Sequence, residues 1–129
     1  MKRKTGSFDM VVDSSVWLEI FLEGEKYKEC EKLIKKETLY VPSLILFELY
    51  KKIKTKVSED IALECVSHLS QHTVVDLTRD VALLAGDLSL EYKLAMADSV
   101  VLAHSRLLSC PLVTLDNDFS SVPGVLVVR

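Results

Sequence analysis

The chain has 129 residues, the length of a single domain that can bury a sizeable core. About half of the residues are hydrophobic (49%), 27% are charged, and glycine and proline are scarce, which argues against long linkers or disordered tracts. The formal net charge of -3 argues against strong non-specific nucleic-acid binding, although a local basic surface can coexist with an acidic site.

Cysteine usage and hydropathy bear on the compartment. Cys30, Cys65 and Cys110 are odd in number and far apart, which is typical of a reducing environment rather than of a disulfide framework or a zinc site. The basic N-terminus is not followed by the apolar core of a signal peptide, and no apolar run approaches the ~20 residues of a membrane span. We therefore expect a cytoplasmic protein without a membrane partner.

Apolar spacing and helix-start signals predict alternating strands and helices along the chain. In chain order, the predicted elements are strand 10–12, helix 14–22, helix 25–37, strand 38–41, helix 43–54, helix 58–71, strand 73–75, helix 78–92, helix 96–109, strand 112–115 and strand 125–128.

The predicted strands are short and uniformly apolar, so both faces of their sheet are expected to be covered by helices. Together with the alternation of strands and helices, this predicts an α/β fold, a three-layer α/β/α sandwich around a mostly parallel sheet. We expect one domain at 10–129, preceded by an N-terminal extension at 1–9.

Aspartates follow two of the predicted strands. Asp13 comes after the first strand, and Asp116 and Asp118 follow the apolar run that begins at Leu112. Because ligands of open parallel sheets bind outside the carboxyl ends of the strands, these acids are expected to converge at one edge. Asp and Asn are also good turn formers, and this alternative holds better for Asp118 than for Asp116.

Two further acids stand among apolar residues of predicted helices. Glu48 lies within Leu46-Phe-Glu-Leu49, where a lone buried carboxylate would need a cation, hydrogen-bond donors or a metal; otherwise it reaches water at the rim. Asp98 lies near the start of an apolar helix, so it is either a first-turn or N-cap acid or part of a site. The same N-cap alternative applies to Asp13.

Taken together, these acids have no obvious cationic partner, and clustered carboxylates repel one another by about 4 kcal/mol per close pair. Hard divalent cations prefer oxygen ligands and would offset this repulsion, so the pattern favours Mg²⁺ or Mn²⁺ and phosphate chemistry. Ser14, Ser15 and Thr114 supply hydroxyls that could hold the acids in place.

Four short blocks of the sequence resemble the successive acidic motifs of PIN domains, and their order and spacing are similar to those of the small stand-alone VapC-type toxins. The blocks are Val12-Asp-Ser-Ser15, Leu46-Phe-Glu-Leu49, Ala97-Asp-Ser-Val100 and Thr114-Leu-Asp-Asn-Asp-Phe119. The resemblance extends from about Met10 to Arg129.

The resemblance implies an α/β/α sandwich and a ribonuclease that depends on Mg²⁺ or Mn²⁺. It implies an acidic quartet with an auxiliary acid and supporting hydroxyls, which by position are Asp13, Glu48, Asp98 and Asp116, then Asp118, and then Ser14 or Ser15 with Thr114. It also implies an RNA substrate, a homodimer and an antitoxin protein whose peptide fills the acidic groove.

Other interpretations remain open at this point. A PIN-like fold retained only for binding would need no complete quartet, and a receiver-like regulatory domain would use Asp13 and Asp76 but not Glu48 or Asp98. His68 and His72 have a spacing that can chelate zinc, but no third ligand is apparent, so they are interpreted as surface histidines. The basic runs at 2–4, 35–36 and 51–56 are solvated faces or RNA contacts.

Overall fold

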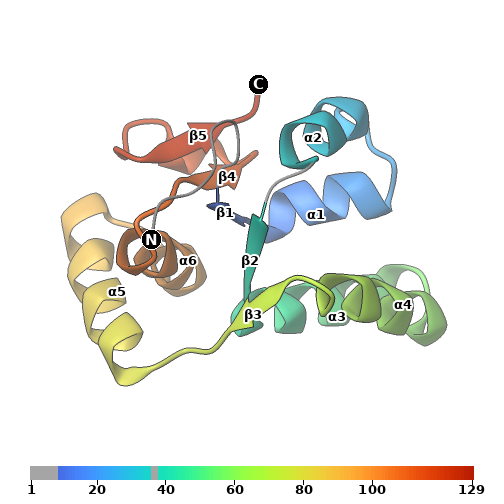
Figure 1. The fold of residues 1–129 in the computed structure, drawn as a ribbon, viewed down its shortest axis with the longest axis horizontal. Helices are drawn as coiled ribbons and strands as arrows, with labels where there is room; N and C mark the ends of the chain where they lie inside the picture. Colours follow the sequence, from blue (N-terminus) through green and yellow to red (C-terminus); the bar gives the residue numbers. More distant parts are fainter. Residues whose placement is uncertain (1–8, 36–37) are drawn as a thin grey trace.

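The structure is a computed structural model that describes residues 9–35 and 38–129. Within these residues, five strands form one sheet in the order β3-β2-β1-β4-β5, and every neighbouring pair is parallel (Figure 1). The strands are β1 (Asp9–Val12), β2 (Thr38–Pro42), β3 (Thr73–Val75), β4 (Leu112–Thr114) and β5 (Val125–Val127). The predicted α/β class with a parallel sheet is therefore confirmed.

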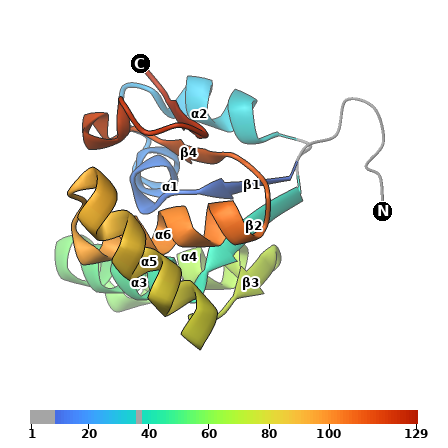
Figure 2. The same cartoon turned by 90° about the vertical axis from the view of Figure 1, so that its left-hand side faces the viewer.

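Helices cover both faces of this sheet. The helices found in the described ranges are α1 (Ser14–Phe21), α2 (Tyr27–Ile34), α3 (Ser43–Lys56), α4 (Glu59–Leu69), α5 (Arg79–Tyr92), α6 (Met96–Leu107) and the short 3₁₀ helix η1 (Asn117–Phe119). Figure 1 shows α1 to α4 on one side of the sheet and α5 with α6 on the other. The quarter turn in Figure 2 places α5 and α6 in front of the strands.

The order of the strands creates a switch point beside β1. The chain moves outward from β1 to β2 and β3, and then crosses the opposite face through α5 and α6 to place β4 on the other side of β1. Connections from β1 and β4 therefore leave the sheet in different directions. Such a point leaves a crevice outside the carboxyl ends of the two strands.

The core consists of the strands and one buried stripe from each packed helix. Val11, Val12 and Val113 in the central strands are fully buried. On α3 the buried positions are Ile45, Leu49 and Ile53, whose spacing of four residues gives the helix a single apolar face. Helix α6 differs, because every residue from 99 to 105 is buried, as expected for the helix packed between the sheet and α5.

Local signals explain where several helices begin and end. The Ser58 hydroxyl accepts from the Ile61 backbone N–H at 3.1 Å, so Ser58 caps α4 as the sequence predicts. Helix α6 was predicted to reach residue 109 but ends at Leu107, because Ser109 adopts a left-handed conformation with φ of 54°.

Parts of two predictions fall outside the structure's described ranges. Of the expected extension at 1–9, residues 1–8 are not described, and Asp9 is the first residue of β1. The last two residues of the helix predicted at 25–37 are likewise not described. Among the described residues, no helix combines the length and apolar character needed to cross a membrane.

Candidate metal centre

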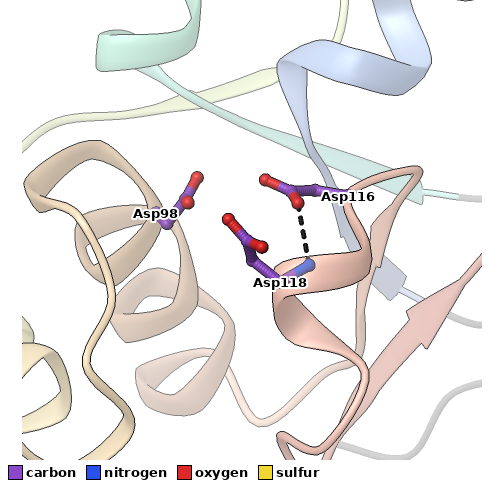
Figure 3. Close-up of side chains that lie close together, drawn as sticks. All are labelled: Asp98, Asp116 and Asp118. Carbon is purple, nitrogen blue, oxygen red and sulfur yellow. Dashed lines mark hydrogen bonds between the residues drawn. The ribbon is translucent and has the colours of Figure 1, made fainter.

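Three aspartates meet at the edge of the sheet. One carboxylate oxygen each from Asp98, Asp116 and Asp118 lies within 4.8 Å of the other two. Figure 3 shows Asp98 extending from its helix toward the two aspartates that follow β4. Asp98 and Asp116 are eighteen positions apart in the sequence, so the fold brings these acids together.

The 3₁₀ helix η1 sets the positions of two of these acids. Asp116 Oδ1 accepts a hydrogen bond from the backbone N–H of Asp118 at 2.8 Å and thereby caps η1 (Figure 3). The turn-forming role therefore belongs to the side chain of Asp116, whereas the sequence interpretation assigned it more readily to Asp118. This hydrogen bond uses only Oδ1 of Asp116. The other oxygen, Oδ2, and the exposed carboxylate of Asp118 still face the group of three aspartates.

Asp13 follows β1 and is held by hydroxyl groups. Its side chain is 5% exposed, and its Oδ2 accepts from Thr114 Oγ1 at 2.7 Å and from Ser15 Oγ at 3.1 Å. Asp13 occupies the N-cap position of α1, but its carboxylate makes no capping hydrogen bond. The N-cap interpretation is therefore wrong for its side chain, which Thr114 and Ser15 hold at the end of β1 instead.

The same two hydroxyls fix the turn after β4. Thr114 Oγ1 accepts from the Asp116 N–H at 3.0 Å, and Ser15 Oγ accepts from the Leu115 N–H at 3.0 Å. Thr114 thus joins the carboxylate of Asp13 to the backbone of Asp116. Movement of either acid relative to the other would break a buried hydrogen bond.

Glu48 approaches this group from α3. It is half-buried; burial raises the pKa of its carboxyl, and the charge of Asp13 raises it further. A hydrogen bond from the Ser14 hydroxyl and the positive charge of Lys52 act in the opposite direction. The sequence interpretation missed this influence of the Lys52 charge, although the position of Lys52 four residues after Glu48 on a helix was the available signal.

Asp98 has a strongly raised pKa. Its pKa rises from 3.8 to about 6, first because of burial and then because of the charges of Asp13, Asp116, Glu48 and Asp118. Asp98 lies in the first turn of α6, but the N-cap position is Ala95, and no side chain caps this helix. The five acids therefore form one electrostatic unit.

The donor set fits a hard divalent cation. Among the residues that the structure describes, the one ion pair joins Lys54 to Glu59 at 2.9 Å, so neither a lysine nor an arginine neutralises the acidic unit by direct pairing. Carboxylate oxygens that lie this close together without a cationic partner are the ligands that Mg²⁺ and similar ions prefer.

The histidines and Trp17 lie outside the acidic unit. Trp17 is 1% exposed and contacts the rings of His68 and His72 at centroid distances of 6.2 and 5.5 Å. These contacts are typical of core packing with histidines at its edge, and the candidate metal groups in the described part of the chain do not include either histidine. His104 is buried in α6, and its burial lowers its pKa.

Comparisons with known proteins agree with this architecture. The family profile of the PIN domain matches residues 10–125. A toxin–antitoxin complex from Klebsiella pneumoniae contains a chain with a TM-score of 0.79 and 22% identity, over 91% of this chain and 95% of that one. The sarcin–ricin loop cleaving toxin VapC20 of Mycobacterium tuberculosis has a TM-score of 0.77 and 18% identity, over 92% and 98%.

A DNA-bound VapBC complex from Salmonella typhimurium gives a TM-score of 0.74 at 18% identity, over 94% of this chain and 97% of that one. At these identities the solved structures establish a shared fold. A search of curated proteins found no significant match.

Proposed function

The chain belongs to the PIN domain family, and we propose that it is an endoribonuclease that depends on Mg²⁺ or Mn²⁺ and hydrolyses RNA phosphodiester bonds. The observation that carries this proposal is the approach of three carboxylate oxygens to within 4.8 Å at the switch point of the sheet. Membership of this family also sets aside the receiver-like alternative.

We assign the metal-holding role to Asp98, Asp116 and Asp118, whose oxygens are mutually closest. Asp13 and Glu48 complete the acidic unit from β1 and α3, so the proposed catalytic set is Asp13, Glu48, Asp98 and Asp116, with Asp118 as an additional ligand. When bound, the divalent ion would lower the pKa of a water and neutralise charge at the phosphate.

The hydroxyl groups have a positioning role in this proposal. Thr114 and Ser15 donate to Asp13, which favours its ionised form and opposes the desolvation that raises the pKa of this buried carboxyl. Ser14 does the same for Glu48. The three hydroxyls therefore hold the acids in position and partly offset the rise in their pKa that burial causes.

We further propose that this ribonuclease is the toxin of a toxin–antitoxin pair in the cytoplasm, and that it acts as a homodimer. The support is the fold shared with chains of toxin–antitoxin complexes, one of which is described as a toxin that cleaves the sarcin–ricin loop. All three cysteines are free and buried, as is usual in a reducing compartment. An antitoxin protein is the corresponding partner.

Cleavage of folded total RNA by the purified protein tests the enzymatic proposal. We expect cleavage with Mg²⁺ or Mn²⁺, none with a chelator, and a loss of at least about 100-fold in the Asp98→Asn variant. Asp87→Asn is the matched control, because Asp87 is an exposed aspartate on α5 outside the acidic unit.

Equal cleavage by the wild type and Asp98→Asn would refute the site assignment. A lack of cleavage by the wild type, together with RNA binding, would favour the alternative of a PIN domain retained only as a binding module.

A further inference from the structure

A groove runs along α3 directly beside Glu48. It has a volume of about 400 Å³ and lies between Ser14 and Leu18 of α1 and one face of α3. On that face, Glu48, Lys52 and Lys56 form one row, and Phe47 and Lys51 form a second. Because four residues advance a helix by about 6 Å, both rows lead away from the acidic unit in regular steps.

The lysines of this groove are available to bind an anion. Lys51, Lys52 and Lys56 are exposed, and none of them forms an ion pair with any acid that the structure describes. Lys54 is different, because it binds Glu59 at 2.9 Å and does not line the groove. The groove therefore carries three cationic side chains next to a site that is strongly negative.

Phe47 is an aromatic ring in an unusual position. Its side chain is 60% exposed, it precedes Glu48, and Lys51 Nζ lies 5.7 Å from the centre of its ring. A single exposed apolar residue is ordinary on a protein surface. An exposed ring inside a basic groove is instead the arrangement on which proteins stack the bases of single-stranded nucleic acids.

We propose that this α3 groove binds the single-stranded RNA that flanks the scissile phosphate, with one base stacked on Phe47 and successive phosphates on Lys51, Lys52 and Lys56. The inference rests on the proposed function, because it takes the acidic unit beside Glu48 as the hydrolytic site. It also accounts for RNA binding by a chain with a net charge of -3, because the lysines are concentrated along one path.

The groove selects single strands on chemical grounds. In a duplex the bases are stacked on one another, so the base faces on which an aromatic ring could stack are covered, and only base edges, sugars and phosphates are exposed. Stacking on Phe47 thus requires an unpaired or extruded base. The lysines alone would hold either form.

Fluorescence anisotropy with a short, labelled single-stranded RNA of mixed sequence tests the proposal. The Asp98→Asn background prevents cleavage during the measurement, and a salt series separates the two kinds of contact. We expect Lys52→Ala to reduce the slope of log affinity against log salt by about 0.7, the value for one phosphate contact on a single strand. Phe47→Ala should weaken binding about tenfold without changing that slope. Phe47→Tyr, which keeps an aromatic ring, should bind like the parent protein.

Lys54→Ala is the matched control for the lysines, and we expect it to leave both affinity and slope unchanged. An RNA duplex should bind Phe47→Ala and its parent equally. If Lys52→Ala and Phe47→Ala both bind the single strand like Lys54→Ala, the proposal is refuted. An effect of the lysines without any effect of Phe47 would also refute it, since the groove would then be a general anion surface.

The result is separable from the enzymatic proposal. Cleavage that depends on metal and Asp98, combined with unaltered binding in the groove variants, would reject the α3 groove and leave the nuclease in place. Binding that depends on the groove, without any cleavage by the wild type, would reject the nuclease and leave an RNA-binding surface.

Discussion

The buried hydroxyl of Thr114 connects two acids that lie more than a hundred positions apart in the sequence. Its side chain is fully buried, donates to Asp13 at 2.7 Å and accepts from the Asp116 N–H at 3.0 Å. Valine has nearly the same shape but lacks the hydroxyl, so Thr114→Val tests this connection alone. We expect a 10- to 100-fold loss of metal affinity or activity, roughly the effect of removing a partner that orients a ligand.

Metal titration by calorimetry, alongside RNA cleavage, measures this effect. Thr114→Ser keeps the hydroxyl and should retain most of the metal affinity. If Thr114→Val and Thr114→Ser lose metal affinity equally, packing rather than the hydrogen bond explains the loss.

The raised pKa of Asp98 predicts how metal-free stability depends on pH. The folded carboxyl has a pKa of about 6 against an ordinary value of 3.8, so between these values the folded state holds the extra proton. Stability therefore decreases as pH rises from about 4 to 6 and stays lower above that window. Asp98→Asn removes this contribution and should stabilise the metal-free protein by about 1–2 kcal/mol at pH 7.5, after allowance for solvent screening.

Urea denaturation in chelator over a pH series measures this difference. The two proteins should have similar stability near pH 4 and diverge as the pH rises. Because Asp13 and Glu48 also have raised pKa values, the variant keeps part of the slope. If the free energies of unfolding of the wild type and Asp98→Asn followed parallel curves at all pH values, the raised pKa of Asp98 would be contradicted.

At the residue scale, the sequence identified the acids better than their partners. Asp98, Asp116 and Asp118 could be singled out because apolar flanks make an isolated carboxylate conspicuous, and the structure brings their oxygens within 4.8 Å of one another; their metal-binding role stays a proposal. The roles of Lys52 beside Glu48 and of Asp116 as the cap of η1 were not predicted. Both depend on which way a side chain points once its helix or turn is packed, and that direction is set by tertiary contacts.

At the scale of elements, most strands and helices could be read from apolar spacing and start signals. Helix α5 is an example, because Thr78 precedes it and accepts from the Val81 N–H at 3.2 Å. The short 3₁₀ helix η1 was not predicted, since three residues provide no periodicity. The end of α6 was misplaced because the left-handed turn at Ser109 lacks the glycine that usually signals it.

The cap at Thr78 gives a prediction that separates stability from activity. Thr78→Ala leaves the first turn of α5 without its side-chain acceptor and should cost about 1 kcal/mol in the free energy of unfolding. RNA cleavage at 25 °C should not change. The hydroxyl of Thr78 bonds to the Val81 N–H rather than to the acidic unit, whose residues are distant in the sequence. Urea denaturation and an activity assay on the same preparation check both statements.

Thr78→Ser, which retains a capping hydroxyl, should match the wild type in stability. A loss of cleavage in Thr78→Ala that exceeds the loss of folded protein would show that α5 influences the site through α6, against which it packs.

At the scale of the whole molecule, the sequence predicted the layers and the parallel sheet, but not the order of the strands. The order β3-β2-β1-β4-β5 depends on which helical connections cross the same face of the sheet. The packing of complete helices determines this arrangement. This order places β1 beside β4 and so brings Asp13 next to Thr114. Convergence of Asp13 with Asp116 could be expected from strand ends alone, whereas the pairing of these two strands required the structure.

Metal binding by the assembled site should stabilise the whole fold, because the acidic unit exists only when β1, β4, α3 and α6 are packed together. An ion that binds only the native state adds about 2.7 kcal/mol at a concentration 100 times its Kd. At pH 5 the proton on Asp98, with a pKa of about 6, competes with the ion and should weaken its apparent affinity about tenfold relative to pH 7.5. Urea denaturation with and without Mn²⁺ at the two pH values measures both effects.

Asp98→Asn should lose most of this stabilisation, while Asp87→Asn, on the exposed face of α5, should keep it. Stabilisation that is equal at both pH values, or that persists fully in Asp98→Asn, would mean that the ion binds elsewhere on the molecule. Because the measurement needs no RNA, it tests the metal centre independently of any substrate. A centre that binds metal in this way but cuts no RNA would place the failure in substrate recognition rather than in the acidic unit.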